Sequence, residues 1–244
     1  MKISFNIDYE TVFGEEILLN VVERVKNMKD KISQFRMNNV HGKHWWYDLN
    51  KSASAQNSVI DYFYSIDCDG NEKRHEWFTQ PHRLELSADN GKSYKVFDRW
   101  IDIPEDSYLY SSAFTECVNK RSLSTPANSA YSKTIRLIVR APQLRDNRSL
   151  AIVGKADCIG AWDVFKAVPM CEHNYNEWVV DIDASRLKDN KLEFKFAAID
   201  NDDNKNTLWE TGFNRQIDLE DIPDGDVAVY YLDQAFFEIS DIKL

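Results

Sequence analysis

Glycine and proline are scarce in this sequence, with 8 and 6 positions among 244 residues. Neither GxGxxG nor GxxxxGKS or GxxxxGKT occurs, which excludes the two glycine-rich loops that commonly cradle nucleotide phosphates. An excess of positive charge is also lacking, because 30 Lys and Arg stand against 40 Asp and Glu, for a net charge of -10. This balance argues against nucleic acid or an anionic membrane surface as the partner. No apolar run is long enough to cross a membrane as a helix.

Cysteine is also rare, and the four residues are scattered without a CxxC pair: Cys68, Cys117, Cys158 and Cys171. The first residues, 1–7, alternate apolar and polar and lack the continuous apolar core and cleavage site of a secretory signal. We therefore expect a cytoplasmic protein with reduced thiols, in preference to disulfides. No metal or cofactor is expected, since His41 and His44 lack a third ligand and 67–72 lacks the spacing of a calcium loop.

Aromatic residues, by contrast, are abundant: Trp 7, Tyr 11 and Phe 13 make up 13% of the chain. Aromatic side chains are favoured in strands that pack two sheets together. Their flat faces also suit flat ligands, and sugars are the commonest such ligand for an acidic protein. The composition therefore favours a β-rich fold and indicates sugar binding as one candidate function.

The chain contains an internal repeat with an offset of 132 residues. Four pairs match at this offset: Trp46 with Trp178, Trp77 with Trp209, 3–7 with 135–139, and 62–64 with 194–196. A period this long is typical of a duplicated domain rather than of a solenoid. The sequence predicts domains at 1–122 and 132–244, joined by a small, polar, proline-containing linker at 123–131.

Each half shows the alternation of apolar and polar residues that is typical of half-buried strands. In the second half Ile135, Leu137 and Val139 alternate in this way, and turn residues separate the successive strands. The predicted fold class is all-β, with two immunoglobulin-like antiparallel β-sandwich domains in tandem. One exception is the segment from Val21 to Met37, whose apolar residues follow helical spacing and predict a short helix.

Two tryptophans of the second half, Trp162 and Trp209, fall in loops, whereas Trp178 is in phase with the apolar residues of a strand and is expected in the core. Lys195 lies between two phenylalanines of another strand and is therefore expected to point to solvent. With the amide of Asn214, the loop tryptophans and this lysine can form an aromatic platform with polar anchors. The alternative is that both loop tryptophans pack at the edge of the core.

Several segments of the second half belong to one pattern: VGKADCIGAWD at 153–163, KAVPM at 166–170, Trp178, EFKF at 193–196 and WETGFNR at 209–215. In this combination they closely resemble the starch-binding domain, carbohydrate-binding module family 20. The resemblance implies a site in which Trp162 and Trp209 stack on glucose rings while Lys195 and Asn214 hydrogen-bond to sugar hydroxyls. All four positions match the family's pattern. The expected partner is an α-1,4-glucan such as starch, glycogen or a maltooligosaccharide.

The first half matches this family less well. Trp46 takes the core position, Trp77 takes the platform position, and His82 falls in the asparagine–arginine position. Phe63 replaces the lysine and is expected to point outward, toward another domain. The segment Val21–Met37 stands where the family has its tryptophan loop. We therefore expect the first domain to be a degenerate module, with at most a weak remnant site at Trp77 and His82.

Two tandem modules, the first of them degenerate, resemble the N-terminal region of a disproportionating 4-α-glucanotransferase of glycoside hydrolase family 77. The resemblance implies a transferase acting on α-1,4-glucans, with a catalytic domain beginning beyond Leu244. No residue of this chain is therefore expected to be catalytic, and its expected function is non-catalytic glucan binding. Two alternatives stay open: a structural or regulatory sandwich pair that mediates domain or subunit contacts, and a complete enzyme.

Overall fold

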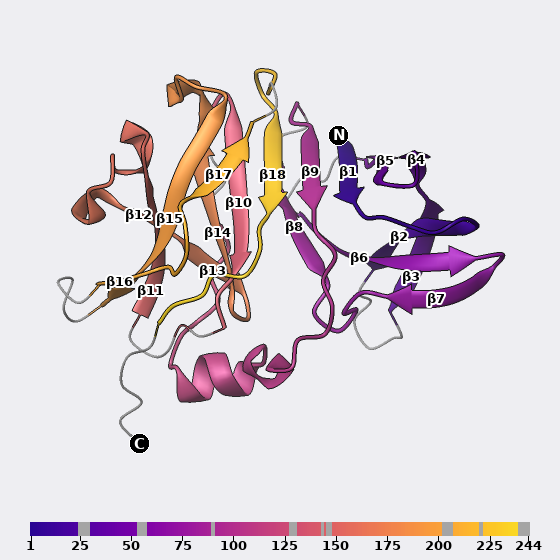
Figure 1. Cartoon of the computed structure of the whole chain (residues 1–244), viewed down its shortest axis with the longest axis horizontal. Helices are drawn as coiled ribbons and strands as arrows, with labels where there is room; N and C mark the ends of the chain where they lie inside the picture. The colour runs from indigo at the N-terminus through magenta and orange to yellow at the C-terminus, as the bar shows by residue number, and fades with distance from the viewer. Residues whose placement is uncertain are drawn as a thin grey trace. The chain divides into compact units, whose positions relative to one another are not determined.

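The computed structural model describes residues 1–23, 30–52, 58–88, 91–126, 131–142, 144, 148–201, 207–219 and 222–238 (Figure 1). The chain divides into two compact units. The first unit comprises Met1–Glu105 and Val227–Tyr231, and the second comprises Asp106–Asp226 and Leu232–Leu244.

The first unit is built from strands in two sheets. Its strands are β1 (Lys2–Asp8), β2 (Glu15–Glu23), β3 (Lys31–Arg36), β4 (Asn38–Val40), β5 (His44–Asn50), β6 (Ser58–Cys68), β7 (Asn71–His75), β8 (His82–Leu86), β9 (Tyr94–Asp98) and β18 (Val227–Tyr231). In one sheet β3, β2, β6 and β7 pair antiparallel in that order, and β8 also pairs with β6. In the other, β4, β5, β1, β9 and β18 follow one another, and β9 runs parallel to both β1 and β18.

The second unit combines strands with short helices. Its elements are η1 (Ser107–Leu109), η2 (Ala113–Val118), β10 (Thr134–Arg140), β11 (Arg148–Gly154), η3 (Asp157–Ile159), η4 (Val164–Lys166), β12 (Val168–Pro169), β13 (Cys171–Asn174), β14 (Glu177–Asp183), η5 (Ala184–Arg186), β15 (Lys191–Asp200), β16 (Thr207–Trp209) and β17 (Arg215–Asp218). Strands β13, β14 and β10 form one antiparallel set. Strands β12, β11, β15 and β16 form another, and β17 also pairs with β15. No helix in the described ranges is long and apolar enough to cross a membrane.

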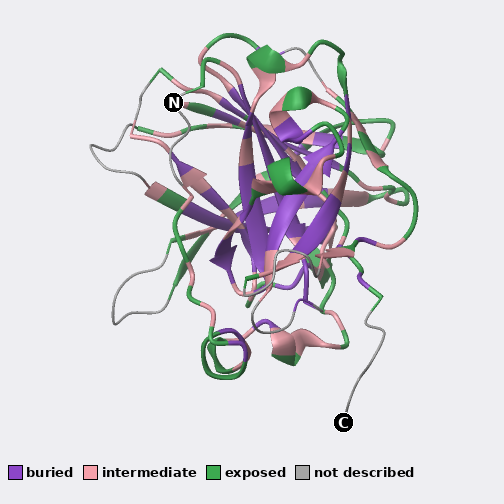
Figure 2. Ribbon diagram, turned by 90° about the vertical axis from the view of Figure 1, so that its left-hand side faces the viewer, coloured by how far each residue is buried: buried purple, intermediate pink, exposed green. Residues whose placement is uncertain are grey.

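The core of each unit follows the predicted alternation. In the first unit the apolar residues Ile3, Phe5 and Ile7 of β1 are at most 1% exposed, and in the second the rings of Phe194 and Phe196 on β15 are fully buried and meet edge to face. Figure 2 shows the buried residues concentrated along the strands, with exposed residues mostly in the connecting segments. The all-β, sandwich-type fold class predicted from the sequence is therefore confirmed. The four cysteines are free in this structure.

The helix expected from Val21 to Met37 is wrong. Residues 21–23 end β2, and 31–36 form β3, which pairs antiparallel with β2. The central part of the segment, 24–29, lies outside the described residues. Pairing explains the outcome, because β2 is hydrogen-bonded to β6 along one edge and to β3 along the other, and these ladders override local helical spacing.

The core tryptophan of the first unit is Trp45 rather than the predicted Trp46. Trp45 is 1% exposed, its indole N–H donates to the carbonyl of Tyr9 at 3.1 Å, and it pairs with Ile7 across β1 and β5. In the second unit the equivalent pair is Val139 with Trp178, which is 4% exposed, as predicted. The two strand pairs correspond, but the second strand is displaced by one residue from the fixed offset of 132.

Phe63 is not the outward residue that was expected. It lies on β6, whose central residues are buried on both faces, and its side chain is 6% exposed. The rings of His75 and Phe78 lie at centroid distances of 6.5 and 6.2 Å from it. The predicted alternation is kept, but side chains from distant segments cover the face that was expected to be exposed.

The segment before the second half packs within the second unit. The guanidinium of Arg121 is paired with the carboxylate of Glu172 at 3.0 Å, and the backbone N–H of Ser124 donates to the carbonyl of Glu172 at 2.8 Å. Residues 127–130 of the expected linker lie outside the described residues. The domain bounds 1–122 and 132–244, and the duplication behind them, stay predictions.

Candidate functional site

Trp162 is presented to solvent by a tight turn that directly follows η3. Gly160, Ala161 and Trp162 have successive positive φ angles of 91°, 48° and 63°, a left-handed conformation that is rare outside glycine. A Cβ on Gly160 would lie 2.8 Å from the carbonyl oxygen of Lys166, so glycine is required there. The Trp162 N–H donates to the carbonyl of Gly154 at 2.9 Å, and the side chain remains 37% exposed. The turn therefore fixes an exposed tryptophan beside the last residue of β11.

Lys195 and Trp209 share one face of the sheet that contains β15. Trp209 on β16 pairs with Ala197 on β15, so these two side chains point to the same side of the sheet. Lys195 is two residues before Ala197 on β15, and its side chain therefore points to that side as well. The Lys195 ammonium donates to the carbonyls of Glu210 and Gly212 at 3.0 and 2.7 Å. Trp209 is 42% exposed. The lysine is thus held in place, and one of its three N–H groups is left over among the described residues.

Asn214 joins this face through Glu193. Its side-chain amide donates to the Glu193 carboxylate at 2.8 Å, and Glu193 lies two residues from Lys195 on β15. On the neighbouring strand, Val153 pairs with Lys195 immediately before Gly154, where the Trp162 loop is bonded. The structure therefore places Lys195, Trp209 and Asn214 on one face, with the Trp162 loop at its border. That they contact sugar stays a prediction.

Glu210 anchors the loop that carries this site. Its side chain is buried, and its carboxylate accepts hydrogen bonds from the N–H of Phe196 at 3.2 Å and from Nε of Arg215 at 2.8 Å. The Arg215 guanidinium is also bonded to the carbonyl of Asp233 at 2.8 Å and lies over the Phe196 ring. The ion pair between the buried Glu210 carboxylate and the partly buried Arg215 thus ties both ends of the 209–215 loop to β15.

Two further aromatic side chains close in sequence to the predicted site residues are highly exposed. Phe213 is 97% exposed next to Asn214, and Phe165 is 77% exposed in η4, three residues after Trp162. Strand alternation cannot predict them because neither belongs to a strand. Glu193 and Glu210, which hold Asn214 and Arg215, could be found in the sequence only as part of the EFKF and WETGFNR motifs.

The first unit repeats the Glu210 arrangement with different neighbours. Glu76 exchanges bonds with Tyr64 as Glu210 does with Phe196, because its N–H donates to the Tyr64 carbonyl at 2.9 Å and its carboxylate accepts from the Tyr64 N–H at 2.7 Å. His75, which precedes Glu76, therefore takes the place of Trp209. The match of Trp77 with Trp209 is wrong by two residues, and Trp77 is buried, with 7% exposed.

His82 occupies the place of Arg215 rather than that of Asn214. It pairs with Tyr62 across β6 and β8, as Arg215 pairs with Phe194 across β15 and β17. Its ring faces the Glu76 carboxylate at 3.2 Å and is 1% exposed. The structure therefore brings neither Trp77 nor His82 to the surface of the first unit.

A buried polar cluster surrounds His82 in the first unit. The hydroxyls of Tyr62 and Tyr64 donate to the carboxylate of Asp98, which also lies 3.6 Å from the His82 ring, and Tyr231 packs edge-on against that ring. Burial raises the pKa of Asp98 to about 6, although the nearby His82 and the tyrosine hydrogen bonds oppose this rise.

The contribution of Asp98 to the stability of the first unit is therefore expected to become more favourable as the pH falls from 7 to 5. Below about pH 6 the folded state holds a proton on Asp98 that the unfolded chain, with an ordinary aspartate pKa, releases. The variant Asp98→Asn lacks this titration. Between pH 7 and pH 5 its free energy of unfolding should therefore rise less than that of the unaltered protein, and the difference should be about 1 kcal/mol or more. Urea unfolding of both proteins at pH 5 and pH 7 measures the difference. Equal pH dependence in the two would contradict the assignment.

The described residues line a cavity in each unit. One of about 640 Å³ lies in the first unit among β2, β3, β5, β6 and β8, and its wall includes the Asp61–Arg83 ion pair. The other, of about 220 Å³, lies in the second unit and includes Glu193. Trp162, Lys195, Trp209 and Asn214 line neither cavity, because they lie on an exposed sheet face or at its border. No three His, Cys, Asp or Glu side chains in the described residues are grouped to hold a metal ion.

Several solved structures resemble this chain at low TM-score. A family 15 glucoamylase from Hypocrea jecorina is 17% identical with a TM-score of 0.33, over 46% of this chain and 18% of its own. The family 20 module of a maltotetraose-forming amylase from Pseudomonas saccharophila STB07 is 20% identical with a TM-score of 0.33, over 41% of this chain and 99% of its own. A family 26 module from Eubacterium rectale Amy13K, solved with maltoheptaose, is 12% identical with a TM-score of 0.25, over 100% of this chain and 99% of its own.

Comparison by sequence is more specific. No curated protein matches this chain significantly. A family model does match, under the description starch binding domain, over residues 132–225. This range includes Trp162, Lys195, Trp209 and Asn214. Residues 132–225 of this chain therefore match the starch binding domain family, and all four predicted site residues lie within the match.

Proposed function

We propose that the second unit binds α-1,4-glucans without catalysing a reaction on them, through Trp162, Lys195, Trp209 and Asn214. The observation that carries the proposal is the exposure of Trp209 beside a fixed lysine and amide on one sheet face, inside a segment that matches the starch binding domain model. An α-glucan exposes apolar C–H faces for stacking and vicinal hydroxyls for hydrogen bonds. Aromatic rings flanked by an ammonium and an amide meet both requirements.

The first unit does not offer the same surface. Where the second unit has Lys195 and Trp209, the first has Phe63, which is buried, and His75, whose ring packs against Phe78. Trp77 and His82 are buried as well. These replacements support a division of labour in which the second unit binds the glucan and the first has little affinity for it.

We further propose that the chain is the N-terminal, substrate-binding part of a cytoplasmic 4-α-glucanotransferase whose catalytic domain follows it. The support is the sequence resemblance of two tandem modules, the first degenerate, to that class of transferase. Disproportionation of maltotriose by the protein that the complete gene encodes, and its absence from residues 1–244 alone, tests this step. Activity of residues 1–244 alone would instead favour a complete enzyme.

Binding of an unmodified glucan should be almost independent of salt. The ligand is neutral, and Lys195 acts on it as a hydrogen-bond donor that is already held by two backbone carbonyls. We expect the dissociation constant for maltoheptaose to change by less than about twofold between about 50 and 500 mM NaCl. Calorimetric titration at both salt concentrations measures this. A steep salt dependence would indicate a charged partner in place of the glucan.

A further inference from the structure

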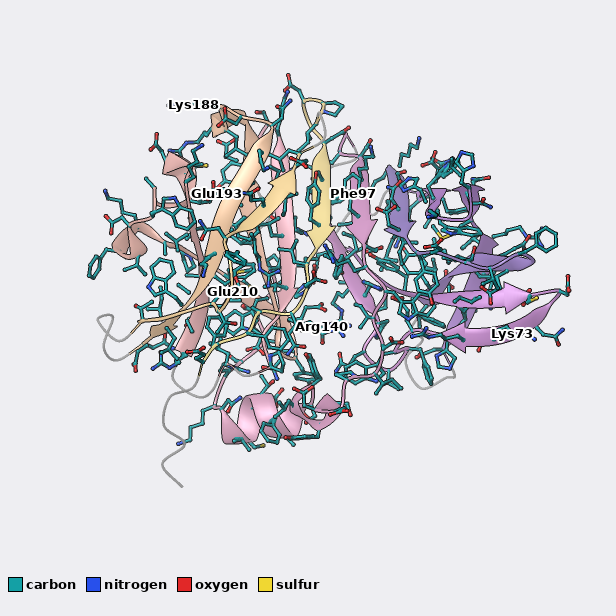
Figure 3. The ribbon with its side chains drawn as sticks, in the orientation of Figure 1. Lys73, Phe97, Arg140, Lys188, Glu193 and Glu210 are labelled. Atoms are coloured by element: carbon teal, nitrogen blue, oxygen red, sulfur yellow. The ribbon has the colours of Figure 1, made fainter. Side chains whose placement is uncertain are left out.

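The 220 Å³ cavity of the second unit adjoins the proposed glucan face. Its walls come from the start of the loop after β11 and from the loop between η5 and β15. Glu193 connects the cavity with the proposed glucan face. Its carbonyl accepts from the N–H of Lys155, which also lines the cavity, at 2.9 Å, and its carboxylate accepts from Asn214 of the glucan face. Figure 3 shows Lys188 in the loop before β15 and Glu193 on the strand. Two residues of strand, about 7 Å, separate Glu193 from Lys195.

The cavity is rich in positive charge for this protein. Four cationic side chains line it, against three carboxylates: Lys155, Arg186, Lys188 and Lys191 against Asp157, Asp189 and Glu193. The local balance is thus one positive charge, whereas the whole chain carries -10. Within the described ranges, none of the four cations is in an ion pair, and one of the carboxylates, Glu193, is occupied by Asn214. The cations therefore remain available to a ligand.

Cations next to a site for a neutral polymer favour a ligand that carries an anionic group, because such a group gains charge-assisted hydrogen bonds there. A phosphate monoester carries nearly two negative charges at neutral pH and accepts strong, charge-assisted hydrogen bonds from Lys and Arg. The cavity has room for about seven water molecules at ~30 Å³ each, which is enough for a phosphate and the hydroxymethyl carbon that bears it.

We propose that this cavity binds a phosphate ester of the glucan, so that the preferred ligand of the second unit is a phosphorylated α-glucan. The proposal rests on the proposed function, because the glucan must first lie across Lys195 and Trp209. A phosphate on a glucose unit that extends past Asn214 then reaches the cations, which an unmodified unit leaves in water.

The test compares maltoheptaose with maltoheptaose carrying one 6-phosphate, titrated into the full chain. We expect the phosphorylated ligand to bind about tenfold more tightly at low salt, as one or two charge-assisted bonds provide. The advantage should shrink as salt is raised. Inorganic phosphate serves as a competitor, and it should displace the ligand only weakly. Equal affinity of the two ligands overturns the proposal, and so does displacement by inorganic phosphate at equal concentration, which indicates a general anion site.

Variants separate this proposal from the proposed function. The double variant Lys188→Gln with Lys191→Gln should remove the tenfold preference and leave the affinity for unmodified maltoheptaose unchanged. A control of equal charge change, Lys120→Gln with Lys133→Gln, should keep the preference. If both double variants keep it, the cavity is not the phosphate site. Failure of unmodified maltoheptaose to bind the unaltered chain would instead count against the proposed function.

Discussion

Replacing Trp209 by alanine in the full chain is expected to weaken maltoheptaose binding by about 30-fold or more. An aromatic anchor in the centre of a small binding site typically contributes ~2 kcal/mol or more on truncation, which corresponds to that factor. Trp162→Ala should have a similar effect. The double variant should lose less than the sum of the two losses, because both rings would hold one glucan segment. Calorimetric titration with maltoheptaose gives all three affinities.

His75→Ala is the matched control for Trp209→Ala, since His75 takes the same place in the first unit. It removes a ring that packs against Phe63 and Phe78, and it should leave glucan affinity unchanged. Circular dichroism establishes that each variant is folded. Unchanged binding in both folded tryptophan variants would show that these residues do not form the site.

Glu210→Gln is expected to destabilise the protein by about 3 kcal/mol or more. The substitution keeps the shape of the side chain but removes the negative charge that faces the Arg215 guanidinium in a buried pair, and breaking such a pair typically costs about 3–5 kcal/mol. The same loop carries Trp209, and the Glu210 carbonyl accepts from Lys195, so glucan affinity should fall as well. Urea unfolding and calorimetric titration measure the two effects.

Glu76→Gln provides the corresponding change in the first unit. Glu76 accepts from the N–H groups of Tyr64 and Ile101 at 2.7 and 2.6 Å and faces His82, so this variant should also lose stability. Its glucan affinity should remain that of the unaltered chain. If Glu210→Gln left both stability and glucan affinity unchanged, the buried pair would not anchor the site. Loss of affinity in Glu76→Gln would indicate that the first unit takes part in binding.

The fold class could be predicted because strand alternation is a local signal. On β15, Phe194 and Phe196 are buried on either side of Lys195 as predicted. On β10, Ile135, Leu137 and Val139 are at most 1% exposed, but the residues between them are buried as well. The four candidate site residues could be named from the sequence because the motif combines loop tryptophans with an outward lysine, and their contact with sugar stays a prediction. The surroundings of that lysine, which include the carbonyls of Glu210 and Gly212, depend on how the loop folds back and could not be predicted from spacing.

The errors arose where distant segments decide the structure. The spacing of Val22 and Ile32 is compatible with a helix, but pairing of β2 with β6 and β3 makes both of them strand residues. A single offset of 132 matched Trp46 with Trp178, although Trp45 is the equivalent residue, because one extra residue separates the strands of the second unit. Phe63 follows the alternation, yet His75 and Phe78 cover it.

The measurement that tests the central claim most directly is the stoichiometry of maltoheptaose binding to the full chain by calorimetry. One glucan site per chain is predicted, and it should be absent from the variant that carries both Trp162→Ala and Trp209→Ala. No detectable binding to the unaltered chain, or binding that survives in the folded double variant, would contradict a glucan site on the second unit.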